Sequence, residues 1–211
     1  MSLNPDAIRA ARDHLAAADP ALKRADAATP EFPWRKWQGG YPGLIKIIVG
    51  QQVSNHAADA IWARLESGTG GVSSTSILRH DIDGLKAFGL SRPKARYALA
   101  IAEAARDGAI DFDALLSMDD EAALAALTSL IGVGRWTAEV YLTFCDGRLD
   151  FFPAGDLALQ EGLRMADGAE VRPTEKQLYA RAEAWRPHRG VAAHLLWAYY
   201  GGVKRGEIVP A

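Results

Sequence analysis

Apolar residues along the chain recur with the spacing of α-helices. They return every three or four positions through most of the sequence, so each predicted helix has one apolar face to bury. Alternating runs of Val, Ile and Thr, which are typical of half-buried β-strands, are missing. The pattern therefore predicts an all-α fold class.

Helix boundaries are marked by residues that cap helix ends. Asn4 fits the N-cap of a helix whose first residue is Pro5. Ser54 and Ser91 also fit N-caps, because their hydroxyls can accept from first-turn amides, and Thr174-x-x-Gln177 fits a capping box. The predicted helices run from Pro5 toward Ala18, from Pro20, through 44–49, from Ser54 to Leu65, around Ile77 and Leu85, from Ser91 to near Gly108, over 119–130, from Arg135 to about Phe144, from about Asp156, after Thr174, and from His188 to Tyr200.

Residues 29–43 interrupt the helical pattern. The segment TPEFPWRKWQGGYPG holds three prolines and three glycines, so we expect an irregular connection there. Its aromatic residues Phe32, Trp34 and Trp37 should pack this connection against the helices.

Composition and charge are those of an ordinary globular protein. Of the 211 residues, 49% are hydrophobic and 24% are charged, and no apolar run reaches the ~18 residues of a membrane-spanning helix. The first residues are polar and lack the apolar segment of a secretory signal, so we expect a cytoplasmic protein with no membrane partner. The formal net charge of −2 gives no overall attraction to phosphate, so any nucleic-acid contact must come from local features.

Cysteine and histidine give no sign of a metal centre. Cys145 is the single cysteine, which excludes an intramolecular disulfide and a cysteine-ligated cluster built from this chain alone. The histidines stand far apart, and the nearest pair, His188 and His194, falls on different faces of a helix. We therefore expect catalysis without a cofactor.

The most specific local motif is the turn Gly132-Val133-Gly134 in LTSLIGVGRWTAEVYL, where one apolar helix stops and another begins. Such a turn leaves backbone amides unpaired at the start of the second helix, and the missing side chains let a phosphate come close. A tight helix–helix connection whose glycines only relieve a positive φ explains the tripeptide equally well. The tripeptide alone leaves both interpretations open.

Several motifs, taken in order, carry a family resemblance. GVGRWTA and FFPAGDLALQ, together with IIVGQQVS, FGLSRPKARYALAIA and AWRPHRGVAAHLLWAYY, resemble the helix-hairpin-helix DNA glycosylase superfamily in its 3-methyladenine DNA glycosylase II branch. The resemblance covers roughly residues 41–203. It implies two helical lobes with a DNA-binding cleft between them, lobe A of approximately 1–40 plus 150–211 and lobe B of approximately 41–149. We expect no N-terminal sheet domain, although that branch often carries one.

Asp156 in PAGDLALQ is the carboxylate that the resemblance assigns to catalysis, because it matches the position of the superfamily's catalytic aspartate. An aspartate at a helix start is more often simply an N-cap, and Asp156 fits that role too. An anion beneath the deoxyribose stabilises the positive charge that develops there as the base departs. The same carboxylate can orient or deprotonate the attacking water.

The resemblance also bears on strand cleavage and on base recognition. Bifunctional relatives carry a lysine two residues after the second hairpin glycine, where its amine forms a Schiff base with the sugar, and this chain has Trp136 there. We therefore expect no lyase activity. Trp136 and Trp197 are predicted to present ring faces to a cationic purine, with Tyr141 in the same base pocket, and core packing is the alternative role for the tryptophans. A tyrosine of some relatives is replaced by Val140, which leaves the substrate range open.

Further DNA contacts are implied by position in the same motifs. Gln52, with Gln51 beside it, matches the position from which a side chain enters the duplex when a base is flipped, and a polar interhelical turn is the alternative. Lys94 and Arg189 either contact phosphate or support the fold. The remaining assignments are phosphate binding by Gly132, Gly134, Arg135, Trp136 and Arg189, and a structural Na⁺ or K⁺ at the backbone carbonyls of Thr128, Leu130 and Val133.

These features together predict a monofunctional DNA glycosylase of base excision repair. It would hydrolyse the N-glycosidic bond of alkylated purines, of the 3-methyladenine and 7-methylguanine type, in double-stranded damaged DNA. We expect a monomer that needs no nucleotide cofactor. Three alternatives stay open: a glycosylase for deaminated bases such as uracil or hypoxanthine, a non-catalytic helix-hairpin-helix DNA-binding module, and a helical scaffold for protein partners.

Overall fold

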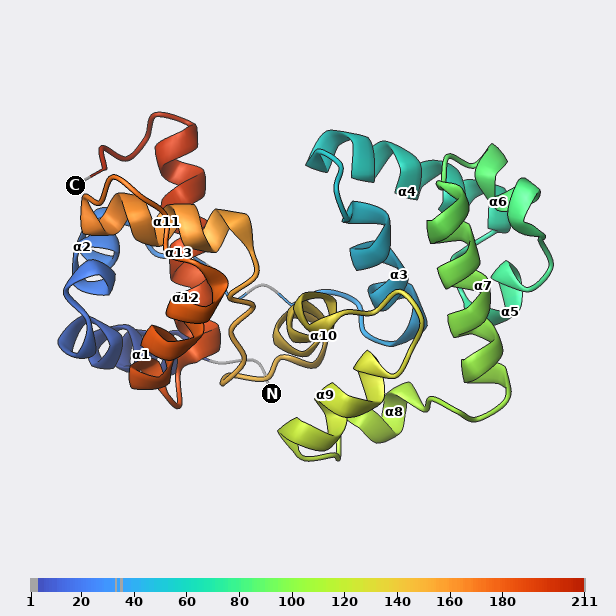
Figure 1. The fold of residues 1–211 in the computed structure, drawn as a ribbon, viewed down its shortest axis with the longest axis horizontal. Helices are drawn as coiled ribbons and strands as arrows, with labels where there is room; N and C mark the ends of the chain where they lie inside the picture. The colour runs from blue at the N-terminus through green and yellow to red at the C-terminus, as the bar shows by residue number, and fades with distance from the viewer. Residues whose placement is uncertain (1–3, 33, 35, 211) are drawn as a thin grey trace. The chain divides into compact units, whose positions relative to one another are not determined.

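The computed structural model describes residues 4–32, 34 and 36–210, and within them it contains helices and no strand. The predicted all-α class is confirmed (Figure 1). The α-helices are α1 (Pro5–Ala18), α2 (Pro20–Ala28), α3 (Gly40–Gly50), α4 (Asn55–Thr69), α5 (Ser74–Ile77), α6 (Ile82–Ala87), α7 (Arg92–Arg106), α8 (Phe112–Leu115), α9 (Asp120–Thr128), α10 (Arg135–Tyr141), α11 (Leu157–Asp167), α12 (Glu175–Ala182) and α13 (Arg189–Lys204), with a π-helix η1 (Leu142–Asp146) and a 3₁₀-helix η2 (Glu183–Trp185).

The chain folds into two compact units. Unit 1 is formed by both ends of the chain, Met1–Lys36 and Gly147–Ala211, and unit 2 is the continuous segment Trp37–Asp146. The side chains assigned to chemistry and to DNA contact are therefore divided between a discontinuous unit and a continuous one.

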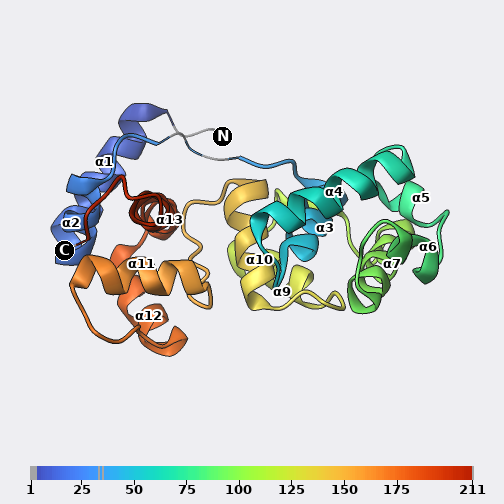
Figure 2. The same ribbon diagram turned by 90° about the horizontal axis from the view of Figure 1, so that it is seen from above.

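Unit 1 packs α1, α2 and α11 around the apolar C-terminal helix α13 (Figure 2). Its core includes the fully buried Trp185 and Tyr199, with Phe32 and Trp34 of the irregular connection packed against it. The connection predicted for this region thus contributes aromatic surface to unit 1, whereas Pro33 and Arg35 lie outside the described residues.

A partly buried ionic cluster, with Asp19 at its buried end, ties the two ends of the chain together inside unit 1. Asp19, the N-cap of α2, accepts two hydrogen bonds from the guanidinium of Arg181, both at 2.7 Å, and one from Trp185 Nε1 at 3.0 Å. Arg181 also pairs with Asp167. Burial by itself would raise the pKa of Asp19, but the bonds from Arg181, Ala21 and Trp185 outweigh it and hold that pKa below its usual value.

Unit 2 is built around α3, which contacts α4, α7, α8 and α10. The sequence LIKIIV explains this position, because Leu44, Ile45, Ile47 and Ile48 are buried and leave little polar surface on the helix. Tyr41 donates its hydroxyl hydrogen bond to the carbonyl of Ala98 at 2.8 Å, which fixes α3 against α7. The single cysteine, Cys145, is buried in this unit.

Local capping signals predicted most helix starts correctly. Asn4, Ser54, Ser91 and Thr174 are N-caps whose side chains accept from backbone amides, and Thr174 with Gln177 forms the predicted capping box. Their success follows from the short range of the interaction, which involves residues only three positions apart.

The observed helices differ from the prediction in one boundary, one change of helix type and one additional helix. The irregular connection ends earlier than 43, because α3 already begins at Gly40. Pro42 is tolerated in its first turn, where the missing amide has no intrahelical acceptor to lose. The helix after the hairpin changes to a π-helix at Leu142, and the single-turn helix α8 was not predicted. Among the described residues, none of the helices is both long and apolar enough to cross a membrane.

Candidate functional site

Asp156 is the N-cap of α11, at the end of the Gly/Pro-rich loop of unit 1. Its Oδ1 atom accepts hydrogen bonds from the amides of Ala158 at 2.8 Å and Leu159 at 3.1 Å, and from Trp197 Nε1 at 3.2 Å. The N-cap role is therefore confirmed. Two amides at the positive end of an 11-residue helix and one indole N–H stabilise negative charge on this carboxyl group.

The loop before Asp156 is held in place by buried residues and by hydrogen bonds to its backbone. Phe152 and Ala154 are buried, and Gln160, one turn into α11, donates its side-chain amide to the carbonyl of Ala154 at 2.9 Å. The amide of Asp156 itself donates to the carbonyl of Pro153 at 2.8 Å. The carboxylate is thus attached to a short backbone segment whose conformation is set by buried contacts.

Trp197, on α13, is supported by a stack of rings within unit 1. His194 is 3% exposed, and its Nδ1 lies 2.8 Å from the carbonyl of Gly190, so that nitrogen carries the proton. The Trp34 ring stacks on His194 at a centroid distance of 3.9 Å, and the Trp197 ring meets His194 edge-on at 6.1 Å. The rings restrain the indole that donates to Asp156.

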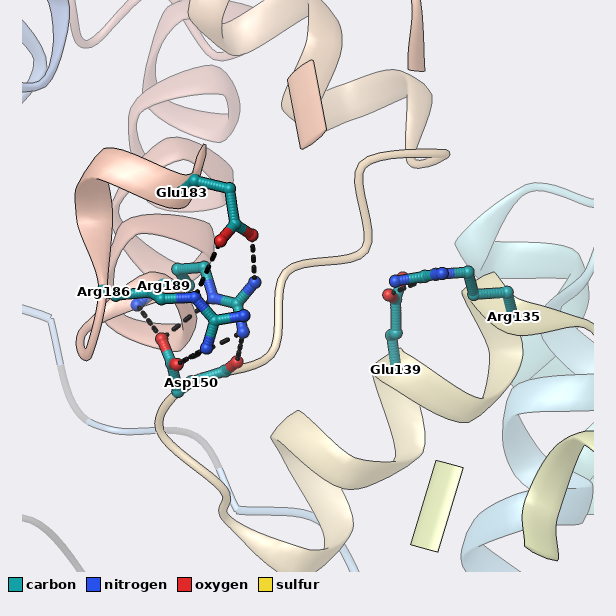
Figure 3. A network of polar contacts seen from close by, with 6 residues as sticks. All are labelled: Arg135, Glu139, Asp150, Glu183, Arg186 and Arg189. Atoms are coloured by element: carbon teal, nitrogen blue, oxygen red, sulfur yellow. Dashed lines mark hydrogen bonds and ion pairs between the residues drawn. The ribbon is translucent and has the colours of Figure 1, made fainter. Parts of the chain in front are cut away.

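Arg189 lies in a network of ion pairs rather than standing alone. It pairs with Asp150 and Glu183, and Arg186 pairs with the same two acids (Figure 3). The Arg189 side chain is only 13% exposed, and it also donates to the carbonyl of Asp150 at 2.6 Å. These contacts favour the fold-supporting role for Arg189, and its phosphate contact stays a prediction.

The hairpin between α9 and α10 belongs to unit 2. Gly132 has a φ of +83°, and a Cβ atom there would lie 2.3 Å from Cγ of Tyr97. Gly132 is therefore required both by its left-handed backbone and by close packing. Gly134 is the N-cap of α10 and has no side chain to bond the first amides of that helix, which is the arrangement expected for an anion-binding hairpin.

The first turns of α10 place the other hairpin residues. Arg135 is exposed and donates from Nε to the buried carboxylate of Glu139 at 2.9 Å (Figure 3), and Trp136 is half-buried. Tyr141 is fully buried, and its hydroxyl accepts from the amide of Gly40 at 2.8 Å. Burial raises the pKa of Tyr141. Because the side chain is fully buried, the structure favours a core-packing role for Tyr141 over the predicted role in a base pocket.

Gln51 and Gln52 form the turn between α3 and α4. Gln51 is half-buried and donates from Nε2 to the Thr137 hydroxyl at 2.9 Å. Gln52 is exposed and has a φ of +56°, the one positive φ of a non-glycine residue in the described part of the chain. Gln51 is thus held by a hydrogen bond, whereas Gln52 is exposed to solvent.

Thr128, Leu130 and Val133 lie at the end of α9 and in the hairpin. Thr128 is the last residue of α9, where carbonyls have no intrahelical donor, and the carbonyl of Leu130 accepts from the amide of Val133 at 3.1 Å. Backbone oxygens suit a hard monovalent ion, and His, Cys, Asp and Glu form no metal-binding group within the part of the chain that the structure describes.

These residues and their order match a known family. The chain belongs to the HhH-GPD superfamily of base excision DNA repair proteins, whose family model matches residues 45–187, so the predicted family is confirmed. DNA-3-methyladenine glycosylase 1 of Schizosaccharomyces pombe is 32% identical over 161 residues, which cover 74% of this chain and 71% of that protein.

Solved structures agree with the sequence relatives. The fold is similar to that of the Schizosaccharomyces pombe 3-methyladenine DNA glycosylase in complex with abasic DNA, with a TM-score of 0.80, 30% identity, and coverage of 89% of this chain and 94% of that one. It is also similar to a DNA-3-methyladenine glycosidase from Bacillus halodurans, with a TM-score of 0.79, 29% identity, and coverage of 97% and 94%.

The sequence predicted some of these residues and missed others. Asp156 and Trp197 were predicted separately, and the structure joins them through a hydrogen bond across 41 positions. The supporting roles of His194, Gln160 and Thr137 were not predicted. No local signal identifies them, because each acts through a partner that only the folded chain brings near.

Proposed function

We propose that this protein is a DNA glycosylase that hydrolyses the N-glycosidic bond of alkylated purines in double-stranded DNA. The single observation that carries the proposal is the environment of Asp156, a carboxylate held by two helix amides and the indole of Trp197. It lies inside the segment matched by the superfamily model. The named relatives, which are 3-methyladenine DNA glycosylases, support the alkylated-base assignment.

The carboxylate contributes by electrostatics. As the base departs, positive charge builds up on the deoxyribose, and an anion fixed beneath the sugar lowers the energy of that transition state. Because helix amides and the indole already hold Asp156 in place, little reorganisation is needed when the charge develops. The same carboxylate can accept a proton from the water that attacks the sugar.

The chemistry of the leaving group fits a site without a strong general acid. A purine alkylated at N3 or N7 already carries a positive charge and departs as a neutral base, so it needs no protonation. The half-buried ring face of Trp197 on α13 attracts such a cationic purine. We assign base recognition in unit 1 to Trp197, and a role for the half-buried Trp136 of unit 2 rests on the resemblance alone.

Trp136 also limits the reaction to hydrolysis. A lyase requires an amine that attacks the sugar, and Trp136 stands where bifunctional relatives carry lysine. The product is then a free base and an intact strand with an abasic site.

DNA contact comes from unit 2 in this proposal. The amides at the start of α10, following Gly134, would bind a phosphate, and Gln52 would fill the gap left by the flipped base. The backbone carbonyls of Thr128, Leu130 and Val133 would hold a Na⁺ or K⁺ that orders the hairpin. The protein acts as a monomer without a nucleotide cofactor.

The test compares the wild type with Asp156→Asn on methylated duplex DNA. Asparagine caps helices as well as aspartate does, so the substitution removes the charge and keeps the cap. We expect single-turnover release of 3-methyladenine and 7-methylguanine to fall by about 10²–10³-fold. Binding to undamaged duplex should stay unchanged.

Asp81→Asn is the matched control, since Asp81 caps α6 through the amide of Gly84 at 2.8 Å and has no predicted role in the reaction. Equal release of base by wild type and Asp156→Asn would overturn the catalytic assignment. Trapping of a covalent adduct with borohydride would overturn the assignment of hydrolysis without lyase activity.

A further inference from the structure

The turn that carries Gln52 is held by a lysine from another helix. Lys94, in the first turn of α7, donates from Nζ to the carbonyl of Val49 at 2.8 Å and to the carbonyl of Gln51 at 2.7 Å. These carbonyls lie 45 and 43 positions away in the sequence, at the C-terminal end of α3. The lysine therefore contacts the backbone on the N-terminal side of Gln52.

The contact is favourable because of where α3 ends. Carbonyls in the last turn of a helix have no intrahelical donor, and the helix dipole makes that end negative. The Lys94 ammonium supplies both the donors and the opposite charge. Burial lowers the pKa of Lys94, as expected for an ammonium group partly withdrawn from water to bond neutral carbonyls.

A second contact holds the same turn from another direction. Gln51 donates to the hydroxyl of Thr137 at 2.9 Å, and Thr137 is 2% exposed within α10, just after the hairpin. The turn is therefore connected both to α7 and to the helix that begins at the Gly-x-Gly motif. Between these anchors and α4, Gln52 keeps a left-handed backbone that L-residues avoid unless the surroundings impose it.

We propose that Lys94 is a positioning residue, which fixes this turn so that Gln52 projects in the conformation needed to enter the duplex. This inference rests on the proposed function, in which Gln52 fills the gap left by the extruded base. A turn that is ordered before DNA arrives loses less conformational freedom during insertion. Lys94 then accelerates extrusion through Gln52, without touching DNA.

The test replaces Lys94 by methionine, which keeps the length of the side chain and removes its charge and donors. Extrusion is followed by stopped-flow fluorescence with duplex DNA that carries 2-aminopurine beside a methylated base. We expect Lys94→Met to slow extrusion by about tenfold. Affinity for undamaged duplex and its dependence on salt should stay the same, whereas loss of a phosphate contact would reduce the salt slope by about 1.

A double-mutant cycle shows whether Lys94 acts through Gln52. Once Gln52→Ala has removed the inserted side chain, adding Lys94→Met should slow extrusion no further. Additive effects, or a reduced salt slope in Lys94→Met, would overturn the inference. If Gln52→Ala itself leaves extrusion unchanged, the insertion role in the proposed function is wrong. If Gln52→Ala slows it and Lys94→Met does not, the positioning role alone is wrong.

Two further variants guard against a general loss of folding. Thr137→Val removes the second anchor with a nearly isosteric side chain, and we expect it to slow extrusion by a smaller factor than Lys94→Met does. Lys86→Met, which removes an exposed lysine of the same unit paired with Asp83, should leave extrusion unchanged. If Thr137→Val and Lys94→Met both extrude the base at the wild-type rate, these two contacts do not hold the turn in place.

Discussion

The two units hold their functional groups by different means. In unit 1 the carboxylate of Asp156 accepts from two helix amides and from the indole of Trp197, which the rings of His194 and Trp34 support. In unit 2 the hairpin depends on backbone shape, with Gly132 lying against Tyr97, and the Gln52 turn depends on bonds to main-chain carbonyls. The carboxylate is thus supported by side chains as well as by helix amides, whereas the hairpin proposed to bind phosphate is shaped by its main chain.

This difference predicts how each unit should respond to substitution. A group held by side chains is weakened when atoms are removed, because a donor or a packed ring is lost. The hairpin has no side chain at its two glycines to remove, and it is damaged mainly when atoms are added where backbone and neighbour already touch, whereas the Gln52 turn depends on the side chain of Lys94. The following predictions test that contrast, from the largest expected effect to the smallest.

Gly132→Ala should cause the largest loss of stability. The added methyl group would overlap the Tyr97 ring, with its Cβ 2.3 Å from Cγ, and alanine would also have to adopt a φ of +83°. We expect the free energy of unfolding to fall by about 2–4 kcal/mol, together with affinity for duplex DNA at low salt. Urea denaturation and a binding titration measure the two effects.

Gly108→Ala is the control for that substitution, because Gly108 has a φ of +76° and open space around its Cβ position. It should show only the backbone cost, about 1 kcal/mol. Combining Gly132→Ala with Tyr97→Ala should recover part of the DNA affinity. If Gly108→Ala proves as damaging as Gly132→Ala, close packing is not what Gly132 provides.

Arg181→Met should cause the next largest loss, through removal of a partner in unit 1. It leaves the carboxylate of Asp19, whose side chain is 6% exposed, without its main ion pair. We expect a loss of about 2–3 kcal/mol, less than for a fully buried pair because the Arg181 side chain is 34% exposed. Arg205→Met, which breaks an exposed pair with Glu207, should leave the free energy of unfolding nearly unchanged, because water screens that pair.

The effect of Arg181→Met should depend on pH. The pKa of Asp19 is lowered in the folded state, so its contribution is complete above the unfolded value of about 4 and is lost as pH falls through the lower folded value. The difference in stability between wild type and variant should therefore shrink below about pH 4. A difference that stays constant down to pH 2 would show that the ion pair is not its source.

His194→Leu should cause the smallest effect, and this effect should fall on the rate of base release rather than on DNA binding. The substitution introduces an apolar side chain of similar size, and it removes the ring that contacts Trp34 and Trp197 together with the hydrogen bond to the carbonyl of Gly190. We expect base release to slow by about tenfold because Trp197 loses its restraint, with duplex binding unchanged. His80→Leu, which removes a ring packed against Phe88 in unit 2, is the control. Loss of DNA binding along with rate in His194→Leu would contradict the separation between the units.

Much of this arrangement could be predicted from the sequence because it depends on local chemistry. N-caps such as Asn4, Ser54 and Thr174 act within one helical turn, and Gly132 provides the positive φ of the turn that follows α9. The same locality explains the errors. Gly40 and Pro42 were assigned to a loop by their composition, whereas burial of Tyr41 and its hydrogen bond to Ala98 start α3 there.

What the sequence determined by itself is the all-α class, the family, the hairpin and the choice of Asp156 as the carboxylate in question. What only the tertiary structure decided is which side chains support these features. Trp197 reaches Asp156, Lys94 reaches the carbonyls beside Gln52, and Arg189 turns inward to Asp150. The reason is that helix periodicity and capping are encoded within a few residues, while a hydrogen bond across some forty positions exists only once packing has brought its two partners together.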